Sequence, residues 1–297
     1  MRVARVRSSL SVRPRVALER DGALYDVATL EACFGRGVPV IGEPSDFGTR
    51  VVAMACAGLA ELDARLVRGD RPSRARLAES ELVELAPCAT ERAAFVQVDL
   101  RARLPNGSPL VRLGHARALE GQAAFVDLPA SEARPAAELW LGALIGDELR
   151  AASAREAKQA VLGLTVVLVW VGLDLEASMS ATGLGSSRGW SAQVGPRLLA
   201  GAELGRLREL LGSIGVEGRG QELGAFTELG TSVEQAIADA SELVHLDAGD
   251  LVALGPWPRG STELLGLELG LHQRVEASIR GMGSLRGLAV QRASGRG

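Results

Sequence analysis

The chain has 297 residues, of which 47% are hydrophobic but only 3% aromatic, so we expect a large core filled mainly by aliphatic side chains. Its 33 basic and 36 acidic side chains nearly cancel and neither sign forms a long block, which argues against a nucleic-acid partner. The most apolar run, residues 161–173, is shorter than the roughly 20 residues that cross a bilayer, so we expect no membrane partner.

Residues 1–75 are predicted to form a small N-terminal subdomain with β-hairpins and one helix. Arginine alternates with apolar residues over the start of the chain, which indicates strands rather than a targeting signal. Two such stretches flank Asp21-Gly22, a pair typical of hairpin turns. Apolar residues then recur at helical spacing over residues 49–68, where Asp46 and Thr49 are candidate caps.

Residues 76–297 are predicted to form a second, β-rich domain. Two helices are expected within it: one over residues 153–163, with a Ser153/Glu156 capping box, and one over 232–245, capped by Ser232. Residues 264–290 alternate at period two, which indicates hairpin strands closing a sheet. We expect a mixed, β-rich α+β fold with a rolled, barrel-like sheet. Further strands are predicted at residues 93–98, 108–113, 123–129, 138–146 and 161–173.

The cysteines give no sign of a disulfide framework or a zinc site. Cys33, Cys56 and Cys88 are odd in number, widely spaced and form no CxxC pair. We therefore expect a cytoplasmic protein.

Several segments, read in order, carry a family resemblance. They are GALYDV, SPLVRLGHARALEGQAAFVDLP, ELWLGALIG, GLTVVLVWVGLDL, VGPRL, LVHLDAGDLVALGPWPRG and RVEASIRGMGSLRG. In order and spacing they resemble the fumarylacetoacetate hydrolase superfamily, whose members include hydrolases, decarboxylases and isomerases of enol and 1,3-dicarbonyl acids. The resemblance covers most of the chain, and it implies the β-rich fold and a homodimer.

The same resemblance implies a magnesium-type ion held by a Glu-x-Glu pair and one Asp, yet this chain departs from that pattern. Alignment on Ile145-Gly146 places the pair at Glu138 and Trp140, whereas a two-residue shift places it at Ala136 and Glu138. The Asp position falls on Val169. The family's lysine falls near Ser186, and its His and Glu that activate water have no counterpart after residue 99. One carboxylate holds magnesium poorly against water, so we expect no metal and no other cofactor.

The remaining candidate residues have both structural and functional interpretations. Trp140, Trp170 and Trp190 either fill the core or form an apolar floor under a substrate. Glu138, if buried, needs a partner such as Arg188, or stays protonated and acts as a general acid or base.

Other polar residues near the expected cleft remain open in the same way. Asp174 and Glu176 form either an acid–base pair at a strand end or a solvated edge paired with arginine. His115 lies in a segment that approaches the cleft in the resembled family, and residues 182–189 suggest a lid-like loop. By the resemblance, Arg259, Thr231 and Ser232 lie where the family binds a substrate carboxylate.

Two functions follow as hypotheses. The first is a metal-independent enzyme that isomerises, dehydrates or cyclises an enolisable carbonyl or polyketide-like small molecule, a lyase or isomerase of biosynthesis. Its catalytic candidates are Glu138, His115 and Asp174. The second is a catalytically inactive pseudoenzyme that serves as a binding or structural partner. The expected substrate-binding residues of the enzyme are Trp140, Val169, Trp170, Arg188, Trp190, Thr231, Ser232 and Arg259.

Overall fold

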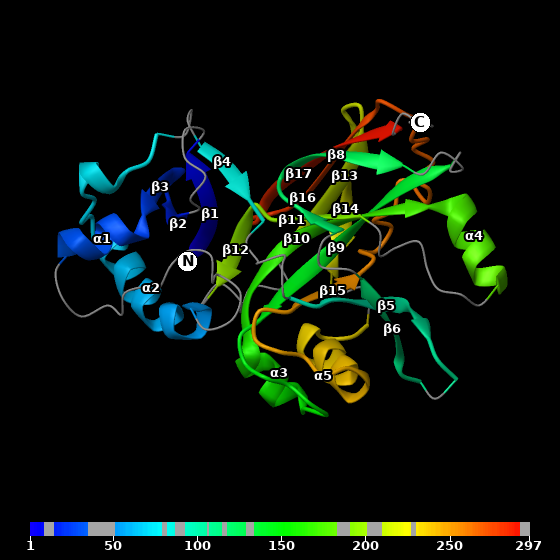
Figure 1. The fold of residues 1–297 in the computed structure, drawn as a ribbon, viewed down its shortest axis with the longest axis horizontal. Coiled ribbons are helices and arrows are strands. Elements are labelled where there is room, and N and C mark those ends of the chain that lie inside the picture. Colours follow the sequence, from blue (N-terminus) through cyan, green and yellow to red (C-terminus); the bar gives the residue numbers. More distant parts are fainter. Residues whose placement is uncertain are drawn as a thin grey trace, which may run out of the picture.

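A computed structural model describes residues 1–8, 15–34, 51–78, 82–86, 93–105, 107–114, 118–128, 134–182, 191–200, 210–226 and 230–291 (Figure 1). The helices are α1 (Val27–Phe34), α2 (Val51–Val67), α3 (Ala154–Ala160), α4 (Leu173–Thr182) and α5 (Val233–Leu243), with a short 3-10 helix at Ser73–Ala75. The strands are β1 (Arg2–Ser8), β2 (Arg15–Arg20), β3 (Ala23–Asp26), β4 (Leu82–Leu85), β5 (Phe95–Arg103), β6 (Pro109–Gly114), β7 (Leu119–Glu120), β8 (Ala123–Leu128), β9 (Pro135–Ile145), β10 (Val161–Gly172), β11 (Ala192–Val194), β12 (Arg197–Ala200), β13 (Leu211–Val216), β14 (Arg219–Ala225), β15 (Leu251–Gly255), β16 (Arg274–Ile279) and β17 (Gly283–Gln291).

These strands form two sheets with an apolar core between them. The larger sheet runs in the order β3-β2-β1-β12-β10-β9-β15-β5-β6, with β4, β7 and β11 paired off this path, and the smaller runs β14-β13-β16-β17-β8. One face of β9 and β10 packs on the smaller sheet, and the other packs on side chains of the N-terminal strands and of α1 and α2. Because both of their faces are covered, β9 and β10 are long apolar runs without alternation.

The strand-rich α+β class predicted from the sequence is confirmed, with the described strands in two open sheets. The hairpin around Asp21-Gly22 joins β2 to β3, and both turn residues have positive φ, as a two-residue hairpin turn requires. The helix expected over residues 49–68 is present as α2, although its cap candidate Asp46 lies outside the described residues, as does Thr49. The predicted capping box of α3 is formed by Ser153 and Glu156.

Three local predictions were wrong. Residues 264–273 form turns and coil instead of a strand, and hairpin pairing begins only at β16. Asp174 and Glu176 lie in the first turn of α4, where a strand end was expected. Helix α3 ends at Ala160 rather than Gly163, because β10 pairs with β9 from Val161 onward.

The N-terminal strands are continuous with the main sheet. Strand β1 pairs with β2 on one side, and on the other it pairs first with β12, over Arg2–Ala4, and then with β4, over Arg5–Ser8. Figure 1 shows this unit, with α1 and α2, on one side of the molecule, and α3 and α5 together beneath the central strands. No helix in the described ranges is both long and apolar enough to cross a membrane.

Candidate functional site

The predicted carboxylate Glu138 lies in the middle of β9, between two partner segments. Across the antiparallel pairing with β10, its direct partner is Val169, and Trp140 is opposite Val167. On the other side Glu138 forms an isolated bridge with Ser261. Because directly opposed residues project from the same face, Glu138, Trp140 and Val169 share one face of the sheet.

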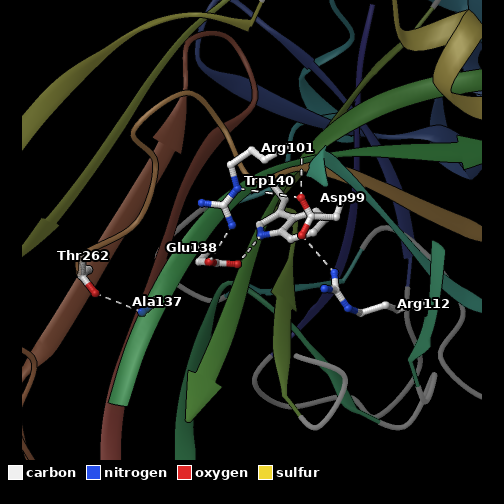
Figure 2. A network of polar contacts seen from close by, with 7 residues as sticks. All are labelled: Asp99, Arg101, Arg112, Ala137, Glu138, Trp140 and Thr262. Atoms are coloured by element: carbon white, nitrogen blue, oxygen red, sulfur yellow. Dashed lines mark hydrogen bonds and ion pairs between the residues drawn. The ribbon is translucent and has the colours of Figure 1, made fainter. Parts of the chain in front are cut away.

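Glu138 is buried, and both of its carboxylate oxygens accept a hydrogen bond (Figure 2). Arg101 on β5 donates from Nη2 to Oε1 at 3.3 Å. Trp140 donates from Nε1 to Oε2 at 3.2 Å. The indole therefore binds the carboxylate that precedes it on the same strand face, and the positive charge beside Glu138 is a guanidinium.

A second carboxylate, Asp99, extends this network along β5. Arg112 on β6 donates from Nη1 to Asp99 Oδ2 at 3.0 Å. The backbone N–H of Arg101 donates to Asp99 Oδ1 at 3.0 Å, and the Nε of Arg101 lies 3.8 Å from the same oxygen. Among the described residues, the cluster thus contains two buried carboxylates, Asp99 and Glu138, and two guanidiniums, whose formal charges cancel.

The backbone brings these groups together through Gly255 on β15. Gly255 pairs with Asp99 in the parallel ladder. A Cβ on Gly255 would lie 2.8 Å from Trp140 Cδ2, so only glycine leaves room for the indole there. Trp140 is fully buried in this position.

This donor set does not fit a magnesium-type ion. Magnesium takes six oxygen ligands and is usually held by one or two carboxylates together with waters and substrate oxygens. Here Glu138 already accepts bonds from Arg101 and Trp140, and the opposed position is the aliphatic Val169. Within the described ranges, no three His, Cys, Asp or Glu side chains lie close enough together to hold an ion.

The structure does not bring Trp170 to this site. Trp170 packs in the core on the opposite face of β10, because strand neighbours alternate between faces. Its Nε1 donates to Gln193 Oε1 at 3.2 Å, inside the molecule. Among the tryptophans that the structure describes, it is thus Trp140 that lies beside Glu138.

Asp174 is also placed apart from Glu138, in the first turn of α4. It accepts a hydrogen bond from Arg134 Nε at 2.7 Å, in agreement with the predicted alternative of an arginine ion pair. Arg134 lines a cavity of about 510 Å³ at the start of β9. Thr262 also lines the cavity, and its Oγ1 accepts the backbone N–H of Ala137, so this cavity lies next to the Glu138 segment without containing Glu138.

The residues expected to bind a substrate carboxylate are divided between two places. Ser232 caps α5, where its hydroxyl accepts the N–H of Gln235, and Thr231 precedes it. Arg259 is exposed, with positive φ, in the turn after β15, two residues before the Glu138 partner Ser261. Arg259 therefore stays a candidate for this site. His115, Arg188 and Trp190 lie outside the described residues.

Sequence reasoning missed Arg101, Asp99 and Arg112. It offered Arg188, which lies outside the described residues, as the partner of Glu138; the described ion-pair partner is Arg101. A signal was present, because period-two alternation in the strand places Asp99 and Arg101 on one face. What the pattern did not indicate was that β15 would lie between β5 and β9 in the sheet.

Comparison with known proteins agrees with this architecture. The model of the fumarylacetoacetate (FAA) hydrolase C-terminal domain matches residues 83–289. An uncharacterized protein of Pyrococcus abyssi is 28% identical over 185 residues, which is 61% of this chain and 79% of that protein.

Solved structures show the same fold over nearly the whole chain. A maleylpyruvate hydrolase from Sphingobium sp. SYK-6, solved in complex with manganese(II) ion and pyruvate, has a TM-score of 0.72 and 19% identity, covering 99% of this chain and 100% of that one. A 2-hydroxyhepta-2,4-diene-1,7-dioate isomerase from Mycobacterium marinum has a TM-score of 0.69 and 19% identity, with the same coverage.

Proposed function

The chain belongs to the fumarylacetoacetate hydrolase family, and on that premise we propose that it is a small-molecule enzyme that enolises a carbonyl compound without a metal ion. Glu138 is its acid–base group. Isomerisation, dehydration or cyclisation of the substrate would each begin with this proton transfer. Arg259 is the candidate for holding a carboxylate of the substrate near the site.

One observation carries the proposal: the buried carboxylate of Glu138 is paired with a partly exposed cation. The Glu138 side chain is 4% exposed, whereas the Arg101 side chain in contact with it is 35% exposed. A displacement of Arg101 would open Glu138 to a ligand without unpacking the core. A positioned carboxylate contributes roughly 10²–10⁴-fold to a proton-transfer step.

A specific observation also favours the second hypothesis, a catalytically inactive binding or structural partner. Both oxygens of Glu138 accept hydrogen bonds, and the neighbouring Trp140 is fully buried. An inactive protein would keep such a network for stability alone. The two functions therefore differ in whether Glu138 exchanges protons with a ligand.

Hydrogen–deuterium exchange at carbon separates them. Pyruvate and 2-oxobutyrate are incubated with the protein in D₂O containing EDTA, and loss of the C3 proton signal is followed by NMR. We expect the wild-type protein to catalyse the exchange and Glu138→Gln to lose it by at least about a hundredfold. Arg280→Ala, which removes an exposed ion pair with Glu222, is the matched control and should exchange normally. Equal rates in wild type and Glu138→Gln would exclude Glu138 as the base, and a folded but inactive wild type would favour the binding partner.

A further inference from the structure

We propose that Arg101 carries the positive charge of the reaction and transfers it from Glu138 to the substrate oxygen. This deepens the proposed function and rests on it, because it names the group that stabilises the enolate. Arg101 is then a catalytic residue, and Asp99 and Arg112 are positioning residues.

Arg101 is the more weakly held of the two guanidiniums in the cluster. Its contacts with Glu138 and Asp99 are 3.3 and 3.8 Å, against 3.0 Å for Arg112 and Asp99. Its side chain is 35% exposed and that of Arg112 only 19%. Meanwhile the backbone N–H of Arg101 is held by Asp99, so the side chain can swing while its anchor stays in place.

Charge balance explains why the movement of Arg101 from Glu138 to the substrate suits an uncharged carbonyl group. Before reaction, Arg101 and Arg112 balance Asp99 and Glu138 among the residues that the structure describes. The substrate C–H bond then breaks, its proton passes to a Glu138 oxygen, its electron pair forms the C=C bond, and the carbonyl π pair moves onto oxygen. Glu138 becomes neutral as the carbonyl oxygen of the substrate becomes negative. The negative charge that Arg101 neutralises therefore moves from Glu138 to the substrate oxygen, and the total charge stays the same. Reprotonation at carbon by Glu138 restores the first state.

The fixed neighbours make this a preorganised arrangement. Trp140 Nε1 holds one oxygen of Glu138 and thereby orients the carboxylate when Arg101 leaves. Arg112 keeps Asp99 neutralised throughout, so Asp99 does not draw Arg101 away from the substrate.

Binding of oxalate, a planar dianion that resembles the enolate of pyruvate, tests the charge transfer without turnover. Titration calorimetry in EDTA buffer compares wild type, Glu138→Gln, Arg101→Met and the double variant. Glu138→Gln imitates the protonated carboxylate and leaves the cluster one positive charge in excess, so we expect it to bind oxalate about tenfold more tightly than wild type. We expect Arg101→Met and the double variant to bind at least about tenfold more weakly.

Thermal unfolding verifies that each variant is folded, and Arg101→Lys provides a second variant that keeps the charge. Lysine should retain part of the oxalate affinity, and Arg280→Ala should bind as wild type does. Equal oxalate affinity in wild type and Arg101→Met, or no gain in Glu138→Gln, would overturn the proposal. The two proposals can fail separately. If the protein catalyses C3 hydrogen exchange but oxalate binding does not depend on Arg101, only the role of Arg101 is refuted. If oxalate binding depends on Arg101 but no exchange is catalysed, the cluster is an anion-binding site and the proposed enzymatic function is refuted.

Discussion

Glu138 on β9 and Val169 on β10 are directly opposed partners in the antiparallel pairing at the centre of the large sheet. Side chains at such positions have Cβ atoms about 4.5–5.5 Å apart, close enough for two carboxylates to share one ion. In this chain one of the two is an isopropyl group, and the remaining carboxylate is bound by Arg101 and Trp140. The opposed pair thus has the spacing of a shared ion site, but Val169 offers no oxygen ligand.

Replacement of Val169 by Asp should make the stability of the protein depend on a divalent cation. Val169 is fully buried, so a carboxylate there is costly without a counter-ion and the variant should melt below wild type in EDTA. Millimolar Mn²⁺ should raise its melting temperature, because binding to the folded state alone is stabilising. Val169→Asn, which lacks the charge, should not respond. A rise for the wild-type protein would show that the present donor set does hold the ion.

Replacement of Gly255 by Ala should destabilise the protein through Trp140. The added Cβ would lie 2.8 Å from Trp140 Cδ2, and the indole is fully buried. Overpacking of this kind costs about 1–3 kcal/mol, measurable by urea unfolding. Gly220→Ala is the control, since its Cβ would meet no atom nearer than 3.6 Å. Equal effects of the two substitutions would mean that Trp140 is not held tightly on Gly255.

Much of the fold was predictable because its signals are local. The Asp21-Gly22 turn, the Ser153 capping box and the Ser232 cap are each fixed by a few neighbouring residues, and all three are present. The apolar run over 161–173 indicated a buried strand for the same reason. By contrast, the alternating leucines of residues 264–273 fit strand periodicity, yet they lie in turns and coil at the rim of a cavity. Tertiary context overrode periodicity there.

The site was predictable only in part, because its partners are distant in the chain. Glu138 and Trp140 were placed correctly side by side, since two-residue spacing puts strand neighbours on one face. Arg101 is 37 residues away from Glu138, and its contact depends on the order of strands in the sheet. Trp170 was assigned to the site by its position in the resemblance. Its strand neighbours Val169 and Val171 lie on the same face as Glu138, so alternation places Trp170 on the opposite face.

The ion pair between Glu19 and Arg197 should make stability depend on pH in the acid range. Burial alone would raise the pKa of Glu19, but Arg197, helped by Arg2, outweighs burial and lowers this pKa below its ordinary value of 4.5. A lowered carboxyl pKa in the folded state adds stability that is complete above the unfolded pKa and disappears as pH falls through the folded pKa.

Arg197→Met tests this pH dependence by urea unfolding at about pH 6 and about pH 3.5. At the higher pH we expect a loss of up to about 3 kcal/mol, because Glu19 and Glu84 would keep partly buried charge without their shared partner. At the lower pH the difference from wild type should shrink, since protonated carboxyls need no cation. Glu19→Gln combined with Arg197→Met should lose less than the sum of the single effects. An equal loss at both pH values would contradict the ion-pair interpretation.

We expect the hydrogen bonds of Gln193 to stabilise the packing of the two sheets. From β11 of the large sheet its Nε2 donates to the carbonyl of Arg286 on β17 at 2.8 Å and to that of Gln122 at 3.3 Å, while its Oε1 accepts from Trp170 Nε1 at 3.2 Å. Gln193 is fully buried, so Gln193→Leu leaves the indole N–H and the Arg286 carbonyl without these partners. We expect a loss of about 2–4 kcal/mol in the free energy of unfolding.

Two further variants separate this hydrogen-bonding role from packing. Gln235→Leu, at an exposed helix position, should change stability by less than about 0.5 kcal/mol. Trp170→Phe combined with Gln193→Leu removes the indole donor as well as its acceptor, and an unpaired buried donor costs more than an absent one. The double variant should therefore be less destabilised than the sum of its single substitutions, by about 1 kcal/mol in a double-mutant cycle. Strict additivity would mean that Trp170 and Gln193 stabilise the sheets independently, and that the hydrogen bond between them contributes nothing measurable.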